Sequence, residues 1–396
     1  MQRADGAQDR ALVVQLARLG DVVQSLPAIE ALRQSRSGIM DAICAEPLVP
    51  VLRACASLGR ALPWSGSHWS GLASMWADHA GEVLSSMRAW FENVPGRPYE
   101  TVYNLNQHAR SILLSHLLGG KVCGPGADGP LASGLSPWGA YLRTVAGDRA
   151  ANRIHLADAW CGMCGVKPLG RGPRLRLSVE ELPGDLAAIG SDNGMWVAIV
   201  IGAGETARWV PPAAWASWVT LFLSRVSEGR VILVGSAEER DAGHSIHEAL
   251  PPLLHARVWN AAGRTTLSQL MHLFARCRWV LGSDTGPLHL ATSVGAQAMG
   301  FYFARARVHE TGPYGEGHRV FQHATEEPPA RWPWAESVAA LLGTGASPAK
   351  GWTLWESRVD HWGACYVSEE QDHRAIGMRE FVWRTLSPHL TESIAA

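Results

Sequence analysis

Val280-Leu281-Gly282-Ser283-Asp284-Thr285-Gly286-Pro287-Leu288-His289-Leu290-Ala291 is the stretch that decides the fold. Its apolar start, together with Arg278 and Trp279, predicts a short strand, and the residues from Pro287 to Ala296 predict a helix. Small polar residues at a strand-to-helix turn leave backbone N–H groups uncovered, and the start of a helix carries about half a positive charge. The turn is therefore suited to bind a phosphate.

Four residues of this turn are candidates for ligand binding. Asp284 offers a carboxylate to a sugar or ribose hydroxyl, and Thr285 offers a hydroxyl donor to an anionic oxygen. Gly286 exposes its backbone, and His289 follows one helical turn later. In isolation, Asp284 or Thr285 is interpreted as a helix cap. Other loops of the chain favour a ligand site.

Length and composition predict two α/β domains. The chain has 396 residues, of which 47% are hydrophobic and 18% charged. The formal charge of −1 argues against a general nucleic-acid binder, because such proteins need an excess of Lys and Arg. The first ten residues lack the apolar core of a secretory signal, and Pro, Gly, Ser and His interrupt the charge-poor runs. We expect a cytoplasmic protein, and a peripheral contact with the inner membrane stays open.

Cysteine usage predicts reduced thiols. The chain has seven cysteines, and only Cys161 and Cys164 have a spacing found in metal or redox sites. The residues around them predict an amphipathic helix, so core packing is favoured over a metal or redox role. The sequence therefore predicts no metal site.

Strands and helices alternate in two separate runs, which predicts two doubly wound, Rossmann-like domains facing each other across a cleft. A Pro-, Gly- and Arg-rich segment between residues 165 and 186 divides the two runs. A glycine-rich loop from Gly124 to Gly139 is expected to be mobile over the cleft. After Ser347 the alternation stops, and a final helix is expected to pack back on the first domain. The predicted divisions are residues 1–175, 176–345 and 346–396.

Two further loops of the second domain follow predicted strands. Gly202 and Gly204 expose backbone, and Thr206 offers a hydroxyl. Arg208 offers a guanidinium that can donate two parallel hydrogen bonds to a phosphate. In the next loop, Gly235 to Glu239, the carboxylates could take ribose hydroxyls, and Ser236 and Glu238 are its candidate site residues. Three such loops on one edge of a sheet predict a nucleotide-diphosphate site. Its candidate residues are Gly202, Gly204, Thr206, Arg208, Ser236, Glu238, Asp284, Thr285, Gly286 and His289.

The first domain carries candidates of its own at the ends of its strands. Gly20 and Asp21 follow the first strand, and Asn106 and Arg110 follow the strand from Thr101 to Leu105. Asp21 could accept a proton from an attacking hydroxyl; its alternative interpretation is a helix cap. Gly20, Asn106 and Arg110 are the acceptor-side candidates.

Neither a dinucleotide fingerprint nor a Walker motif is present, which disfavours hydride transfer and P-loop phosphoryl transfer. The sequence also shows no clear carboxylate pair for Mg²⁺. A leaving diphosphate would then be stabilised by Arg208, by the amides at Asp284 to Gly286 and by the helix dipole.

Four segments together resemble the bacterial ADP-heptose heptosyltransferases, glycosyltransferase family 9. They are Leu16 to Ala28, Val231 to Glu238, Gly263 to Leu270 and Gly282 to Ala291. The resemblance implies a GT-B fold and an inverting, metal-independent transfer from ADP-heptose that needs no cofactor. It further implies that Asp21 is the general base and that Thr285 and Gly286 bind the diphosphate. Arg208 takes the place of a Lys of the family, and Val210 takes the place of a Trp.

The predicted function is transfer of heptose to a hydroxyl of a lipopolysaccharide-type surface glycan. Two alternatives stay open: a protein O-heptosyltransferase acting on Ser or Thr, and a nucleotide-sugar-binding protein without catalysis. The Trp-rich insert from Trp64 to Trp90 and the tail after Ser347 lie outside the resemblance. Their aromatic residues would suit a sugar chain, a polypeptide or a homo-oligomer interface, although core packing is favoured.

Overall fold

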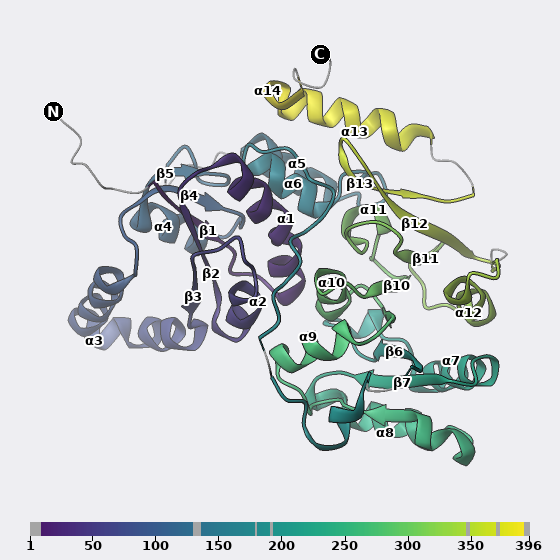
Figure 1. Cartoon of the computed structure of the whole chain (residues 1–396). Helices are drawn as coiled ribbons and strands as arrows, with labels where there is room; N and C mark the ends of the chain where they lie inside the picture. The colour runs from purple at the N-terminus through teal and green to yellow at the C-terminus, as the bar shows by residue number, and fades with distance from the viewer. Residues whose placement is uncertain are drawn as a thin grey trace. The chain divides into compact units, whose positions relative to one another are not determined.

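The computed structural model describes residues 9–129, 136–178, 180–190, 193–345, 349–369 and 373–391. Contacts divide the chain into two compact units, shown in Figure 1. The first unit comprises Met1–Gly147, Ala157–Leu169 and Val382–Ala396, and the second comprises Asp148–Leu156 and Gly170–Phe381.

The first unit is built on a five-stranded parallel sheet in the order β3-β2-β1-β4-β5. Its strands are β1 (Arg10–Val14), β2 (Ile39–Ala45), β3 (Arg60–Trp64), β4 (Tyr99–Asn104) and β5 (Gly119–Cys123). The central strand is fully buried from Ala11 to Val14, as expected for a strand covered on both faces. The order reverses between β1 and β4, and ligands of doubly wound folds bind at such a switch point.

Helices connect the strands of the first unit, as the alternation predicts. They are α1 (Leu19–Ser35), α2 (Val49–Arg53), α3 (Gly66–Asn93), α4 (Ala109–Leu118), α5 (Pro137–Val145), α6 (Leu156–Met163) and α14 (Pro388–Thr391). The sequence pattern missed β3, a short edge strand in which only Leu62 is buried and Pro63 interrupts the pattern. Part of the predicted loop from Gly124 to Gly139, residues 130–135, lies outside the described residues.

Cys161 and Cys164 lie in the core at α6 and just after it, in agreement with the packing role favoured above. Burial raises the pKa of both thiols well above the ordinary value. Within the described ranges, no group of three or more His, Cys, Asp or Glu side chains could hold a metal ion.

The second unit contains an eight-stranded sheet in the order β13-β12-β11-β10-β9-β6-β7-β8. Its strands are β6 (Met195–Val200), β7 (Gly229–Val234), β8 (Val258–Asn260), β9 (Trp279–Gly282), β10 (Gln297–Tyr302), β11 (Arg319–His323), β12 (Trp352–Asp360) and β13 (Gly363–Val367). The six strands from β6 to β11 run parallel, and the direction of the winding reverses between β6 and β9. This reversal is the switch point of the second unit.

The helices of the second unit start mainly at the carboxyl ends of its strands. They are α7 (Pro212–Arg225), α8 (Arg240–Glu248), α9 (Leu267–Ala275), α10 (Gly286–Ser293), α11 (Val308–Thr311), α12 (Trp334–Leu342) and α13 (His373–Leu386), whose last turn is counted with the first unit. The core centres on α7, whose Trp215, Trp218 and Phe222 are fully buried against the sheet.

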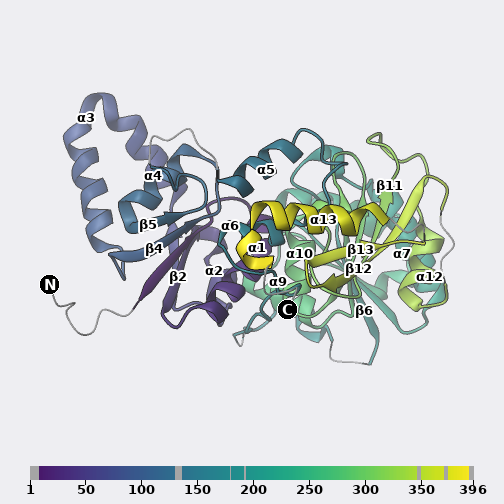
Figure 2. The same ribbon diagram turned by 90° about the horizontal axis from the view of Figure 1, so that it is seen from above.

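The tail differs from the separate segment predicted for residues 346–396. Strands β12 and β13 form an antiparallel hairpin that extends the second sheet from β11. The sequence pattern missed them because the alternation of strands and helices stops after Ser347, and the local pattern does not reveal that β12 pairs with β11. Figure 2 shows α13 running beside this hairpin. The Arg379 guanidinium of α13 donates to both carboxylate oxygens of Asp360, at 2.6 and 2.8 Å.

The end of α13 packs on the first unit, as predicted for the final helix. Trp383 is buried against Trp138 of α5, with ring centroids 4.6 Å apart. The Trp138 indole N–H donates to the Ser387 hydroxyl at 2.8 Å. Across the described part of the chain, no helix has the length and apolar character needed to cross a bilayer.

Gly162→Ala is expected to destabilise the first unit, although alanine normally favours helix over glycine. A Cβ at position 162 would lie 2.1 Å from Cε2 of the buried Trp138. Overpacking of this kind typically lowers the free energy of unfolding by about 1–3 kcal/mol. Urea unfolding followed by circular dichroism measures the change.

Gly71→Ala is the matched control, because Gly71 lies within α3 and a Cβ there meets no atom within 4 Å. It should leave the free energy of unfolding unchanged or raise it by up to about 1 kcal/mol. Equal stability of the two variants would contradict the packing of α6 against Trp138.

Candidate functional site

A cavity of about 470 Å³ opens at the carboxyl edge of the second sheet. Its walls come from the loops after β6 and β7 and from the starts of α9 and α10. Its lining residues are Val200, Gly202, Ala203, Gly204, Val234, Gly235, Ser236, Glu239, Thr265, Thr266, Leu267, Leu270, Thr285 and Pro287. The structure thus brings together four of the predicted residues, namely Gly202, Gly204, Ser236 and Thr285.

Glu239, and not the predicted Glu238, lines this cavity. The Glu239 carboxylate accepts a hydrogen bond from the Ser236 backbone N–H at 2.6 Å and so caps the turn after β7. Glu238 is exposed, and a hydrogen bond with the Ser236 side chain lowers its pKa. The Ser-x-x-Glu pattern of residues 236–239 was the sequence signal that distinguishes the two glutamates.

Two glycines make room for the Glu239 carboxylate. A Cβ on Gly202 would lie 1.5 Å from Oε1 of Glu239, and a Cβ on Gly235 would lie 2.6 Å from Oε2. Any larger residue at position 202 would therefore displace the carboxylate. The loops after β6 and β7 therefore leave space for the Glu239 carboxylate between them.

A buried ion pair joins the loops after β6 and β9 at the switch point. Arg208 donates through one guanidinium nitrogen to the Asp284 carboxylate at 3.1 Å and to the Asp284 carbonyl at 2.7 Å. The other carboxylate oxygen of Asp284 lies 3.3 Å from Nε2 of His289. Both Asp284 and His289 are buried, whereas the Arg208 side chain is 16% exposed.

Asp284 remains ionised despite its burial. Burial by itself raises the pKa of this carboxyl, but the hydrogen bond with His289 and the charges of His289, Arg208 and Arg149 outweigh it and hold the pKa below the ordinary value. Arg149, which sequence reasoning missed, forms an ion pair with Glu310 at 2.5 Å. No motif around Arg149 marked it, because its partner lies 161 residues away in the chain.

The predicted donor residues therefore divide into two groups. Arg208 and His289 both bind Asp284, and Thr206 is exposed on the η3 turn (Thr206–Arg208) outside the cavity lining. Thr285 lines the cavity, and its hydroxyl does not cap α10. Gly286 is the first residue of α10. The residues with groups directed to a ligand are fewer than the sequence suggested.

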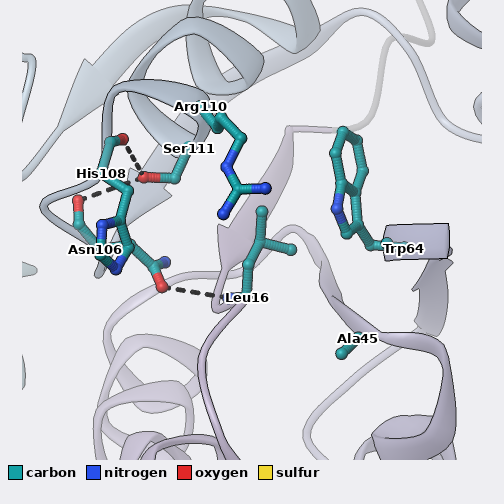
Figure 3. A pocket seen from close by; sticks show the side chains of 8 residues that line it. Leu16, Ala45, Trp64, Asn106, His108, Arg110 and Ser111 are labelled. Carbon is teal, nitrogen blue, oxygen red and sulfur yellow. Dashed lines mark hydrogen bonds between the residues drawn. The ribbon is translucent and has the colours of Figure 1, made fainter. Parts of the chain in front are cut away.

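A second cavity, of about 220 Å³, lies at the switch point of the first unit (Figure 3). Asn106 holds this point together, because its Oδ1 accepts from the Leu16 N–H at 3.1 Å and its Nδ2 donates to the Val14 carbonyl at 2.8 Å. Arg110 also lines the cavity. Two of the three predicted acceptor-side residues, Asn106 and Arg110, are therefore brought together.

Gly20 and Asp21 lie in the first turn of α1, directly after β1. An Asp21 carboxylate oxygen accepts from the Arg18 backbone N–H at 3.1 Å. Asp21 is therefore the third residue of α1 and takes part in a capping box, whereas the N-cap residue itself is Arg18. Asp21 is partly exposed.

Residues 167–333, which include the cavity of the second unit, match the family described as glycosyltransferase family 9 (heptosyltransferase). The matched residues are fewer than half of the chain, and they are called the family 9 domain after the model that they match. Lipooligosaccharide heptosyltransferase 2 of Haemophilus influenzae is 31% identical over 106 residues, which are 26% of this chain and 31% of the relative. Lipopolysaccharide core heptosyltransferase OpsX of the same organism is 34% identical over 115 residues. The chain thus aligns with about a third of the length of these curated relatives.

Solved structures extend the similarity of fold beyond the family 9 domain. The ADP-heptose lipopolysaccharide heptosyltransferase II of E. coli has a TM-score of 0.61 at 18% identity, covering 84% of this chain and 98% of that one. A family 9 glycosyltransferase of Veillonella parvula has a TM-score of 0.60 at 17% identity, covering 86% and 90%. The expected GT-B fold class is confirmed.

Asp284→Asn is expected to lower the free energy of unfolding at pH 7 by about 3–5 kcal/mol, because it removes the buried carboxylate partner of Arg208 and leaves only the exposed Glu205 at 3.6 Å. The stabilisation from ionised Asp284 is complete above the ordinary aspartate pKa of 3.8 and is lost as the pH falls through the lower pKa of the folded state. The difference between wild type and variant should therefore shrink from pH 7 to pH 3. Urea unfolding at several pH values measures it.

Asp185→Asn is the matched control, since Asp185 pairs with Arg264 at the surface. Its effect should stay within about 1 kcal/mol. If both variants lost the same stability, or if the difference for Asp284→Asn were constant with pH, the role of the buried pair would be refuted.

Proposed function

We propose that this protein transfers heptose from ADP-heptose to a hydroxyl of a lipopolysaccharide-type surface glycan, with inversion at the anomeric carbon. The cavity at the switch point of the family 9 domain carries the proposal. A fold relative from E. coli, described as heptosyltransferase WaaC with ADP, supports ADP as the nucleotide of the donor; its TM-score is 0.58 at 19% identity, covering 77% of this chain and 91% of that one.

Each part of the nucleotide finds a matching group in the cavity. The Glu239 carboxylate, held between two glycines, suits ribose hydroxyls, which donate to it. The Thr285 hydroxyl and the backbone N–H groups of Thr285 and Gly286, at the start of α10, suit the diphosphate. Leu267 and Leu270 give an apolar wall for the base. In this proposal Arg208 acts by holding Asp284, which fixes the loop that carries Thr285.

The chemistry proposed is a single displacement. The acceptor hydroxyl oxygen forms a bond to the anomeric carbon as the bond from that carbon to the diphosphate oxygen breaks. Asp21 takes the proton of the hydroxyl, and ADP leaves with the electron pair of the broken bond. The charge that develops on the diphosphate is stabilised by N–H groups and the dipole of α10, without need of a metal. The acceptor would be a membrane-associated glycan, so the predicted peripheral contact with the inner membrane belongs to this proposal.

ADP is expected to raise the melting temperature of the whole chain more than GDP or UDP, because a ligand that binds only the folded state stabilises it by mass action. At 100 times its Kd the gain is about 2.7 kcal/mol. Thr285→Val should reduce the ADP-induced shift while the melting temperature without ligand changes little. Thermal unfolding at fixed protein concentration measures both.

Thr220→Val is the matched control, because Thr220 lies in α7 of the same unit and outside the cavity lining. It should keep the full ADP-induced shift. A larger shift with GDP or UDP would refute the donor, and an unchanged shift in Thr285→Val would remove Thr285 from the site.

Asp21→Asn should lower the turnover of ADP-heptose by about 10²–10⁴, the usual contribution of a general base, while the ADP-induced shift is retained. Release of ADP in the presence of a lipopolysaccharide-type acceptor measures turnover. Asp128→Asn, an exposed aspartate of the same unit, should keep full turnover. Full activity in Asp21→Asn would exclude Asp21 as the base.

A further inference from the structure

The wall of the donor cavity that follows β6 consists mostly of backbone. Gly202, Ala203 and Gly204 all line the cavity, and none of them has a side chain larger than a methyl group. This part of the wall therefore meets a ligand chiefly with its peptide groups. The direction of each peptide decides whether the wall presents an N–H, which attracts an anion, or a carbonyl oxygen, which repels one.

The main chain does not hold these peptide groups in place by itself. The hydrogen bond from the Ile201 N–H to the Val234 carbonyl, at 3.0 Å, is the last that ties this end of β6 to the strand β7. Among the described residues, no backbone group of Gly202, Ala203 or Gly204 is bonded to another backbone group. Their orientation must therefore be set by a side chain.

The side chain that sets it is Trp209. Its indole N–H donates to the Ala203 carbonyl at 2.7 Å. Trp209 is 37% exposed and lies outside the cavity lining, whereas Ala203 and Gly204 belong to the lining. The Ala203 carbonyl is thus bound by a group that is not part of the cavity.

The neighbouring N–H follows from the geometry of the peptide bond. A trans peptide is planar, and its C=O and N–H point in opposite directions. When Trp209 holds the Ala203 carbonyl, the Gly204 N–H points away from the indole. Gly204 has no Cβ, so the peptide could turn over at little cost if Trp209 released it. The carbonyl oxygen would then take the place of the N–H.

Gly204 lies on the loop that is tied to the diphosphate end of the proposed donor site. This loop ends at Arg208, which is bound to Asp284, and Thr285 follows directly. An N–H that donates to a phosphate oxygen makes a charge-assisted hydrogen bond. A carbonyl oxygen in the same place would repel the phosphate.

We propose that Trp209 is a positioning residue for the donor: by holding the Ala203 carbonyl, it directs the Gly204 N–H toward the diphosphate. The inference rests on the proposed function, because it assigns a further group to the binding of ADP. Trp209 itself does not touch the donor. Its contribution is to keep one peptide of the cavity wall in the direction that favours an anion.

Titrations of the full chain with ADP and with adenosine, which lacks the phosphates, test the proposal. Trp209→Phe keeps an aromatic ring and removes the N–H donor. It should raise the Kd of ADP at least about fivefold, through loss of one charge-assisted hydrogen bond, and leave the Kd of adenosine unchanged. Calorimetry measures ADP binding, and saturation-transfer NMR measures adenosine binding. The melting temperature without ligand should change little, because Trp209 is exposed.

A second variant isolates the N–H group. Replacement of Trp209 by benzothienylalanine keeps the shape of the ring and puts sulfur in place of the N–H, and it should weaken ADP as Trp209→Phe does. Trp76→Phe is the matched control, because Trp76 lies in α3, is 51% exposed and is outside the cavity lining. It should keep the wild-type Kd of both ligands.

Two results would overturn the role of Trp209. One is wild-type ADP binding in the benzothienylalanine variant. The other is an equal loss of ADP and adenosine binding in Trp209→Phe, which would indicate general damage to the cavity.

The outcome is distinguishable from that of the donor site. If wild type does not bind ADP, the proposed function fails and this inference fails with it. If wild type binds ADP and Trp209→Phe binds it equally well, the donor site stands and only the role of Trp209 is wrong.

Discussion

The buried pair between Arg208 and Asp284 is the interaction on which the arrangement of the second unit depends. It joins the loops after β6 and β9, the two strands between which the winding of the sheet reverses. Two charges in a poorly solvated place are stable only when they are paired and hydrogen-bonded. Asp284 satisfies this condition with Arg208 on one oxygen and His289 on the other. The next residue, Thr285, is thereby fixed at the edge of the donor cavity.

The first unit also joins two strand ends at its switch point, but through a neutral side chain. Asn106 ties the end of β4 to the end of β1 through its amide, as Arg208 ties the loop after β6 to the loop after β9. In both units the residue that joins the two strand ends uses its polar groups in hydrogen bonds within the protein. Arg110 follows Asn106 by four residues, and Thr285 directly follows Asp284. The side chains of Arg110 and Thr285 are bound by no described residue. This division separates residues that build a site from residues that contact a ligand.

Much of the fold was predictable, because buried strands and amphipathic helices alternate at regular spacing, as at β1 with α1 and β9 with α10. The failures have physical causes. Strand β3 is a half-exposed edge, and β12 carries Trp residues whose burial depends on a sheet partner, β11, that the local pattern does not reveal. At the site, the sequence placed Thr285, Gly202 and Asn106 on the right edges. It could not show that Arg208 and Asp284 bind each other, or that Glu239 turns back between two glycines, because both depend on contacts between separate loops.

The central claim is that the cavity of the family 9 domain holds the nucleotide diphosphate of the donor. A crystal structure of the protein with ADP tests this most directly. The account predicts the diphosphate within hydrogen-bonding distance of the Thr285 hydroxyl and the Gly286 N–H, and the ribose against the Glu239 carboxylate, with the Arg208 to Asp284 pair intact. ADP bound elsewhere, or a diphosphate that displaces Asp284 from Arg208, would contradict it.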